Sequence, residues 1–224
     1  NLLEDFNNSN CTRIIAIGGG TVIDMAKILV LKNGKCTEDI FYKRVPLEKV
    51  RPLIAIPTTC GTGSEVSNIS VTEMTKLNTK MGLAIDELYP DYAVLIPELL
   101  TDLPYKFFAA SAIDALIHAI ESYMSPKATI YTELYSKEAM NMILEGFQKI
   151  VKEGHDARLS MLDQFLNASN LAGIAFNNAG NGAVHAMSSP LSGKYHVSHG
   201  EANYQFFTAV FKEYTEKNPT GKIN

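Results

Sequence analysis

The chain of 224 residues is predicted to fold as an α/β domain followed by an all-helical domain. Short runs rich in β-branched residues alternate with clusters of Gly, Pro and Thr in the first half. Long segments with a helical repeat of apolar residues fill the second half. Gly-rich and Thr-rich loops directly follow two of the predicted strands. We place the boundary after residue 101, which gives an α/β domain over 1–101 and a helical domain over 102–224.

The predicted elements follow the chain in this order. Strands are expected at IIAI (14–17), LIAI (53–56), VSNISV (66–71) and KMGLAI (80–85), and the first two are expected to be buried. Helices are expected over roughly 104–124, 129–152, 156–177 and 200–217. The stretch AMSSPLSGKYHVS (186–198) contains Gly, Pro and four serines, so we expect that it is not one continuous helix.

Composition excludes several classes of partner. The 20 basic and 24 acidic residues give a net charge of −4, so the chain has no excess of positive charge that would favour binding to nucleic acid or to an anionic membrane surface. The apolar runs are far shorter than the roughly 18 to 20 residues that span a bilayer. Three cysteines fit neither a disulfide framework nor a CxxC zinc site, which suggests a reducing compartment, so we expect a cytoplasmic protein. With nucleic acid and membrane excluded as partners, we expect it to act on small molecules.

Two loops are candidates for binding a nucleotide. Gly18, Gly19 and Gly20 lie between a strand and a helix start, where free backbone N–H groups can cradle a phosphate. The alternative is a glycine-rich turn without a ligand, with Asp24 only favouring the start of the helix. The segment 57–65 (PTTCGTGSE) follows the second strand and is dense in hydroxyl groups, although alone it can be an ordinary turn. Loops at the carboxyl ends of adjacent parallel strands meet at one crevice, so together they favour a nucleotide.

The helical half carries a candidate metal site. Asp114 and His118 stand one helical turn apart, away from the apolar stripe of the same helix. His185 and His199 flank the Gly/Pro/Ser-rich stretch, which can fold back and bring both rings together. A surface ion pair is the alternative for Asp114 and His118. Four residues of ligand type, in apolar or glycine-rich surroundings, favour a divalent metal.

These motifs resemble the iron-containing, group III alcohol dehydrogenase family through almost the whole chain. The resemblance lies in IIAIGGGTVIDMAK, PTTCGTGSEVS, AIDALIHAIESY and GAVHAMSSPLSGKYHVSHGEAN. It implies a homo-oligomeric enzyme that uses NAD or NADP and a divalent metal, usually iron and sometimes zinc. By this resemblance, we expect a Rossmann-like dinucleotide-binding domain over 1–101 that lacks its first strands, and a helical metal and substrate domain over 102–224 that lacks its C-terminal helices. The implied metal ligands are Asp114, His118, His185 and His199, and the implied cofactor contacts are Gly18, Gly19, Gly20, Asp24, Thr58, Thr59, Thr62, Ser67 and Lys80. Ser189 stands where the family often has a second histidine, which puts the usual proton relay in doubt.

The substrate prediction depends on the segment HAMSSPLSGKYHVSHGEANYQFF, which is similar to the 4-hydroxybutyrate dehydrogenase branch of the family. Lys194 and His196 lie between two implied ligands, where a cation can meet a substrate carboxylate. We therefore expect hydride transfer between a nicotinamide cofactor and 4-hydroxybutyrate or succinate semialdehyde. The alternatives are a dehydrogenase for a neutral alcohol or diol such as propanediol, butanol or glycerol, and a catalytically incomplete fragment that binds nucleotide or metal.

Overall fold

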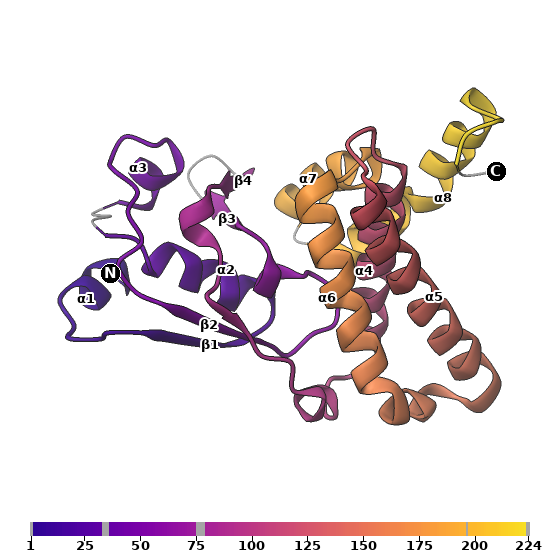
Figure 1. Cartoon of the computed structure of the whole chain (residues 1–224), viewed down its shortest axis with the longest axis horizontal. Coiled ribbons are helices and arrows are strands. Elements are labelled where there is room, and N and C mark those ends of the chain that lie inside the picture. Colours follow the sequence, from indigo (N-terminus) through magenta and orange to yellow (C-terminus); the bar gives the residue numbers. More distant parts are fainter. Residues whose placement is uncertain (1, 33–35, 75–78, 196, 223–224) are drawn as a thin grey trace. The chain divides into compact units, whose positions relative to one another are not determined.

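The structure, a computed structural model, describes residues 2–32, 36–74, 79–195 and 197–222 (Figure 1). It divides into two compact units, the first made of residues 1–58 and 64–96 and the second of 59–63 and 97–224. The loop Thr59–Gly63 thus belongs with the helical unit. Two close approaches explain this: Gly61 lies against the backbone of Ser111, and Gly63, with φ +57°, lies against Gly173. In the described ranges, no helix combines the length and the apolar character that crossing a membrane requires.

The first unit is an α/β unit with a parallel sheet and a separate antiparallel hairpin. The sheet has the order β1-β2-β5, with β1 paired in parallel to β2 from Ile14↔Leu53 to Gly18↔Pro57. Strands β3 and β4 form the hairpin. The elements are α1 (Leu2–Asn7), β1 (Ile14–Gly18), α2 (Gly20–Leu29), α3 (Thr37–Phe41), β2 (Leu53–Pro57), η1 (Ser64–Val66), β3 (Ile69–Met74), β4 (Thr79–Ala84), η3 (Asp86–Leu88) and β5 (Tyr92–Ala93).

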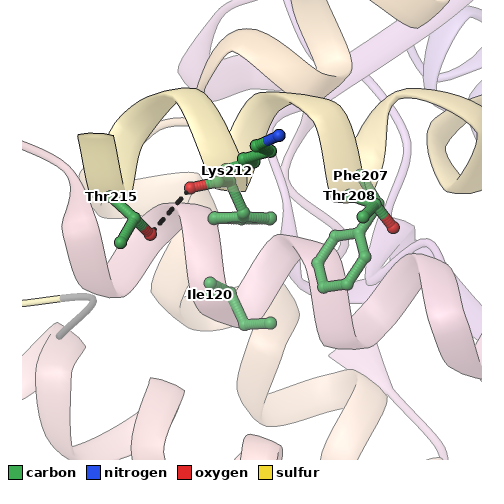
Figure 2. Close-up of a pocket in the computed structure, with 6 residues that line it drawn as sticks. Ile120, Phe207, Thr208, Lys212 and Thr215 are labelled. Atoms are coloured by element: carbon green, nitrogen blue, oxygen red, sulfur yellow. Dashed lines mark hydrogen bonds between the residues drawn. The ribbon is translucent and has the colours of Figure 1, made fainter. Parts of the chain in front are cut away.

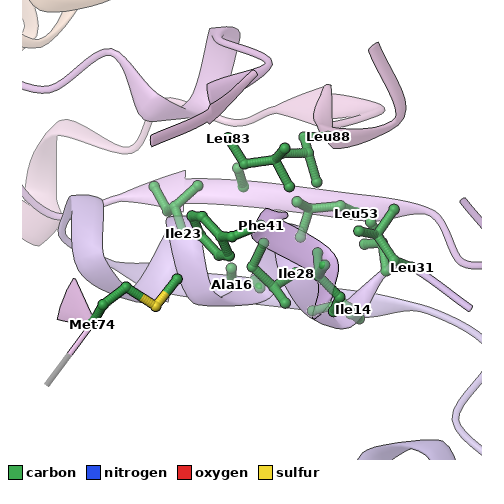
Figure 3. Packing of buried hydrophobic residues seen from close by; sticks show 14 residues of the cluster. Ile14, Ala16, Ile23, Ile28, Leu31, Phe41, Leu53, Met74, Leu83 and Leu88 are labelled. Atoms are coloured by element: carbon green, nitrogen blue, oxygen red, sulfur yellow. The ribbon is translucent and has the colours of Figure 1, made fainter. Parts of the chain in front are cut away.

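The core of this unit forms where α2 packs on one face of the sheet (Figure 3). Ile14 and Ala16 of β1 are buried there together with Ile23 of α2. The expectation that the first strand is wholly buried is wrong, because Ile15 and Ile17 point to the opposite face and are each 56% exposed. The strand expected from residue 66 begins only at Ile69, because Ser64–Val66 forms a 3₁₀ turn.

The second unit is helical, as the apolar periodicity predicts. Its elements are η4 (Pro97–Leu100), α4 (Tyr105–Met124), α5 (Ile130–Glu153), η5 (His155–Met161), α6 (Leu162–Ala179), α7 (Ala183–Tyr195) and α8 (His199–Lys217). Helices α5 and α6 each end at a glycine with positive φ, Gly154 at 92° and Gly180 at 82°. Left-handed backbone is favourable for glycine, so these residues stop the helices cleanly. Helix α4 packs against α5, α6 and α8, which places it at the centre of the unit.

Helix α7 differs from the sequence expectation. It runs through Pro190 and Gly193 to Tyr195, so most of the stretch 186–198 is helical. The hydroxyls of Ser188 and Ser189 donate to the carbonyl of His185, at 3.1 and 2.8 Å, and give that turn further hydrogen bonds beside the proline. Proline and glycine lower helix propensity, but packing of α7 against α8 outweighs that preference. The chain still turns between α7 and α8, as expected.

Candidate metal centre

Four side chains from three helices converge in the second unit. Asp114 and His118 come from α4, His185 from α7 and His199 from the first turn of α8. Their ligand atoms all lie within 4.8 Å of one another. The Oδ1 atom of Asp114 is 3.6 Å from Nε2 of His185 and 3.7 Å from Nε2 of His199. The spacing of four residues on α4 and the turn before α8 therefore bring together the set predicted from the sequence.

The surroundings hold this set in place. The ring of His118 stacks between Phe176 and His185, with centroid distances of 4.3 Å to each, and its Nδ1 is 3.3 Å from the carbonyl oxygen of Gly61. Asn203 donates from Nδ2 to Oδ1 of Asp114 at 2.6 Å. Side chains with such contacts lose little freedom when they bind a ligand.

Glu121 and Asn203 were missed by sequence reasoning. Glu121 lies one turn after His118 on α4, and Asn203 lies one turn after His199 on α8. The carboxylate of Glu121 is 2.6 Å from Nδ1 of His185, which is 64 residues further along the chain. The only sequence signal that could have identified these two residues is their position one helical turn after a predicted ligand. Polar residues at that spacing are common, so the signal is weak. Their partners become visible only in the fold.

The electrostatics of the set favour a cation. Burial, together with the neighbouring His185, lowers the pKa of His118 to about 3, so this imidazole is neutral. Burial opposes ionisation of Asp114, but the neighbouring imidazoles, chiefly His199, outweigh it and the pKa of Asp114 is lowered. Burial also opposes a charge on His185, but the neighbouring carboxylates of Asp114 and Glu121 outweigh it and raise its pKa to about 9. The two carboxylates thus stabilise positive charge at this point.

The donor set fits a divalent metal ion. Nε2 of His185 is buried and has no hydrogen-bond partner among the residues that the structure describes, so a buried nitrogen lone pair or N–H is left for another ligand. Three imidazoles and one carboxylate form a mixed N/O set that suits iron or zinc. His199, with 41% of its side chain exposed, is the most exposed of the four side chains.

The glycine-rich turn of the first unit has the local form expected of a phosphate site. Gly19 is the N-cap of α2, with φ −74° and ψ −178°, and no side chain caps the helix there. The N–H of Thr58 donates to the carbonyl of Gly18 at 3.0 Å, which joins the ends of β1 and β2. A Cβ at Gly18 would lie 2.7 Å from the side chain of Val22. The turn therefore presents backbone at the start of α2, where an anion is stabilised.

Two predicted cofactor residues are engaged in a buried network below this turn. The carboxylate of Asp24 accepts from Ser64 Oγ at 2.5 Å and from the N–H of Val71 at 2.9 Å. Lys27, which is fully buried, donates from Nζ to Ser67 Oγ at 3.0 Å and to Ser64 Oγ at 2.9 Å. Sequence reasoning missed Lys27, although it lies three residues after Asp24 on the same helix. Asp24 and Ser67 thus support the segment that follows the threonine loop.

The remaining predicted residues are more exposed. Thr58, Thr59 and Thr62 are half-buried. Lys80 is exposed on β4, where it pairs with Glu73 in the hairpin register.

The predicted substrate residues lie on or near α7. Lys194 is exposed on the last turn of α7, with Nζ 5.6 Å from the ring centroid of Tyr195. The hydroxyl of Ser189 bonds the backbone of its own helix. His196 lies outside the described residues.

A shallow apolar groove runs along α8 beside α4 (Figure 2). The hydroxyl of Thr215 donates to the carbonyl of Phe211 within its wall, at 3.0 Å. The lining residues are Ile120, Phe207, Thr208, Phe211, Lys212 and Thr215. None of the four converging side chains is among them, so this groove is separate from the candidate metal site.

Fold and site together define a chain with a Rossmann-like unit and a helical unit that carries an Asp/His₃ cluster able to hold a metal ion. Residues 1–97 match the sequence profile of iron-containing alcohol dehydrogenases, and residues 108–224 match that of the C-terminal part of the Fe-containing alcohol dehydrogenase family. The chain therefore belongs to the iron-containing alcohol dehydrogenase family.

Individual relatives agree with this. A 4-hydroxybutyrate dehydrogenase of Clostridium kluyveri is 56% identical over 223 residues, which is 100% of this chain and 60% of that protein. The crystal structure of a 1,3-propanediol oxidoreductase superposes with a TM-score of 0.86 at 30% identity, covering 97% of this chain and 57% of the other. A sulfoacetaldehyde reductase of Bifidobacterium kashiwanohense, crystallised with NAD⁺, gives 0.84 at 29% identity over 94% and 56%. The chain spans about three fifths of the length of these relatives.

Proposed function

We propose that this chain is the cofactor- and metal-binding part of an NAD(P)-dependent dehydrogenase that interconverts 4-hydroxybutyrate and succinate semialdehyde. The observation that carries the proposal is the convergence of Asp114, His118, His185 and His199 in a chain 56% identical to a 4-hydroxybutyrate dehydrogenase. The same proposal includes a homo-oligomeric, cytoplasmic enzyme, as expected from the sequence.

The chemistry divides between cofactor, metal and chain. Asp114, His118, His185 and His199 would hold a divalent ion, which would supply Lewis-acid polarisation of the substrate oxygen, and a bound nicotinamide would supply the hydride chemistry. The chain contributes a neutral imidazole at His118, held in place by ring stacking on Phe176. It also contributes an ionised carboxylate at Asp114, oriented by Asn203. Ser189 stands where the family often has a second histidine, and its hydroxyl donates to the carbonyl of His185 within α7, so that histidine of the usual proton relay has no counterpart at this position.

Cofactor binding is proposed for the first unit and the threonine loop. Gly18, Gly19 and Gly20 offer backbone at the start of α2 to a pyrophosphate. Thr58, Thr59, Thr62 and Lys80 are proposed to contact the cofactor directly. Asp24 and Ser67 are proposed to act mainly by fixing the segment after the loop, because their polar atoms already bind Ser64, Val71 and Lys27.

The role of Lys194 in binding the substrate carboxylate remains a prediction. In a regular helix, nine residues correspond to a rise of roughly 13 Å and a rotation of about 180°. Lys194 therefore projects from the face of α7 opposite His185, which agrees with its exposure. His196 was predicted to act with it. Substrate preference itself and the contribution of Lys194 have to be measured separately.

The test is the ratio of kcat/KM for succinate semialdehyde to that for butanal, measured with NADH and with NADPH on the complete protein. A clear preference for the acid in the parent enzyme supports the proposal, and no preference for the acid contradicts it. Lys194→Met should reduce the ratio if Lys194 binds the carboxylate, with His196→Gln as companion. An equal loss on both substrates would refute that role.

A second candidate is a dehydrogenase for a neutral alcohol or diol. The observation that favours it is the TM-score of 0.86 with a 1,3-propanediol oxidoreductase. The same assay with 3-hydroxypropanal distinguishes the two, because this candidate predicts a higher kcat/KM for the neutral aldehyde.

A further inference from the structure

Glu121 is a buried carboxylate, 2% exposed, that lies directly behind the proposed metal set. Its two oxygen atoms have different partners on α7. Oε2 is 2.6 Å from Nδ1 of His185, and Oε1 accepts from the N–H of Val184 at 2.7 Å. Both contacts are shorter than the usual N–H···O distance, as expected for an ionised acceptor.

The chemistry of these contacts determines the state of the His185 ring. An ionised carboxylate has only acceptors, so the nitrogen that faces it must carry the proton. Nδ1 of His185 is therefore N–H, and in the neutral ring the lone pair lies on Nε2. Nε2 is the buried nitrogen without a hydrogen-bond partner, and it lies 3.6 Å from Oδ1 of Asp114. The lone pair is thus directed into the Asp/His set.

We propose that Glu121 is a positioning residue of the metal site: it selects the tautomer of His185 that binds through Nε2 and supplies the second negative charge of the site. The inference rests on the proposed metal-dependent function. Asp114 and Glu121 together carry two negative charges, which balance a divalent cation. His118, by contrast, has the neutral carbonyl of Gly61 at its Nδ1.

The backbone next to α7 is shaped around this carboxylate. A Cβ on Gly182 would lie 2.7 Å from Oε1 and 3.1 Å from Cδ of Glu121. Gly182 therefore leaves the space in which Glu121 reaches His185. A Gly182→Ala substitution displaces the carboxylate without removing its charge, and so perturbs the same contact independently.

Glu121→Gln is the most specific variant, because glutamine has one acceptor and one donor where glutamate has two acceptors. If its oxygen faces Val184 N–H, its NH₂ group faces Nδ1 and favours the tautomer with the proton on Nε2. If its oxygen faces Nδ1, the backbone N–H of Val184 is left against a donor. Either arrangement weakens a site that needs Nε2 free.

The experiment is a Zn²⁺ affinity measurement by competition with a chromophoric chelator on the purified chain. We expect Glu121→Gln and Gly182→Ala to raise the Kd about 10- to 100-fold, the usual effect of losing a partner of a metal ligand. Glu133→Gln changes a half-buried carboxylate on α5 that pairs with Lys222; it is the matched control and should leave the Kd unchanged. An unchanged Kd in folded Glu121→Gln overturns the inference.

A purely structural role, as an anion at the start of α7, predicts a lower melting temperature but the same Zn²⁺ affinity. The ring nitrogens of His185 provide a second readout that needs no variant. In ¹⁵N spectra of the Zn²⁺-loaded wild-type chain, we expect Nδ1 to carry the proton and Nε2 the metal. Coordination through Nδ1 overturns the inference. Asp114→Ala distinguishes a failure of the role of Glu121 from a failure of the proposed metal site. Full Zn²⁺ affinity in that variant refutes the metal site itself.

Discussion

Lys27 is a fully buried ammonium whose removal gives a measurable change in the stability of the first unit. Its Nζ donates to Ser64 Oγ at 2.9 Å, to Ser67 Oγ at 3.0 Å and to the carbonyl of Ile69 at 2.7 Å, and lies 3.7 Å from Oδ1 of Asp24. Lys27→Met keeps the length of the side chain but removes every one of these contacts. Removing one partner of a buried ion pair costs about 3 to 5 kcal/mol, because the remaining charge is left unpaired.

The same residue makes this cost depend on pH. Burial lowers the pKa of Lys27 from its usual 10.5 to about 8, although Asp24 and Glu65 oppose the shift. Between these two values the unfolded chain binds the proton and the folded chain releases it, so folding becomes more favourable as the pH rises. The gain is about 1.4 kcal/mol per pH unit, or about 3 kcal/mol in all. The free-energy difference between wild type and Lys27→Met should therefore grow by that amount from pH 8 to pH 10.5.

The measurement is urea unfolding of both proteins at a series of pH values. The unfolded fraction is read out by a pulse of hydrogen exchange in β1 that is applied at one common pH. All other titrations cancel in the difference between the two proteins. Lys152→Met, which removes an exposed lysine of α5, controls for the loss of one positive charge. A difference that stays constant or shrinks between pH 8 and 10.5 would refute the assignment of Lys27 as a buried, destabilised cation.

Two further predictions concern glycines. Gly19→Val should weaken the affinity for NAD(H) without changing the melting temperature. Gly19 caps α2 with extended backbone that any residue adopts, so only the approach of the cofactor requires that a side chain is missing there. Equal affinity of both proteins, measured by calorimetry, would make the turn purely structural. Gly63→Ala should lower the free energy of unfolding of the second unit by about 2 kcal/mol or more, because Gly63 has φ +57° and a Cβ would collide with the backbone of Gly173. A melting temperature within about one degree of wild type would contradict this.

The ligand set illustrates what the sequence can predict. Asp114 and His118 are one turn apart on a helix with a clear apolar stripe, so their common direction follows from helix geometry alone. His185 and His199 were joined to them by resemblance and by the turn between them. Glu121 and Asn203 were not found, because nothing local distinguishes a buried polar residue on a helix from an exposed one. Their roles depend on contacts with α7 and α4 that only the fold creates.

The fold shows the same limit. Periodicity predicted α4, α5 and α8 to within about one residue at each end, because each buries one long face. It placed the start of α6 at 156, which is wrong because His155–Met161 forms a 3₁₀ helix and α6 begins at Leu162. It failed for α7, where Pro190 and Gly193 suggested a loop although packing against α8 keeps the segment helical. It also failed for one side of β1, because an apolar run such as IIAI does not reveal which of its faces is covered.

The arrangement of α4, α7 and α8 explains why the metal set is precise although its members are distant in sequence. Ile117, Val184 and Val210 form an apolar cluster that joins the three helices. Each of the first two lies next to a metal ligand in sequence, so burying them fixes the rotation of α4 and α7 and thereby the directions of His118 and His185. The polar contacts then fix the rings themselves, through Gly61 for His118 and Glu121 for His185. Apolar packing thus sets the backbone of the candidate site, and hydrogen bonds determine which nitrogen each imidazole directs toward the other members of the set.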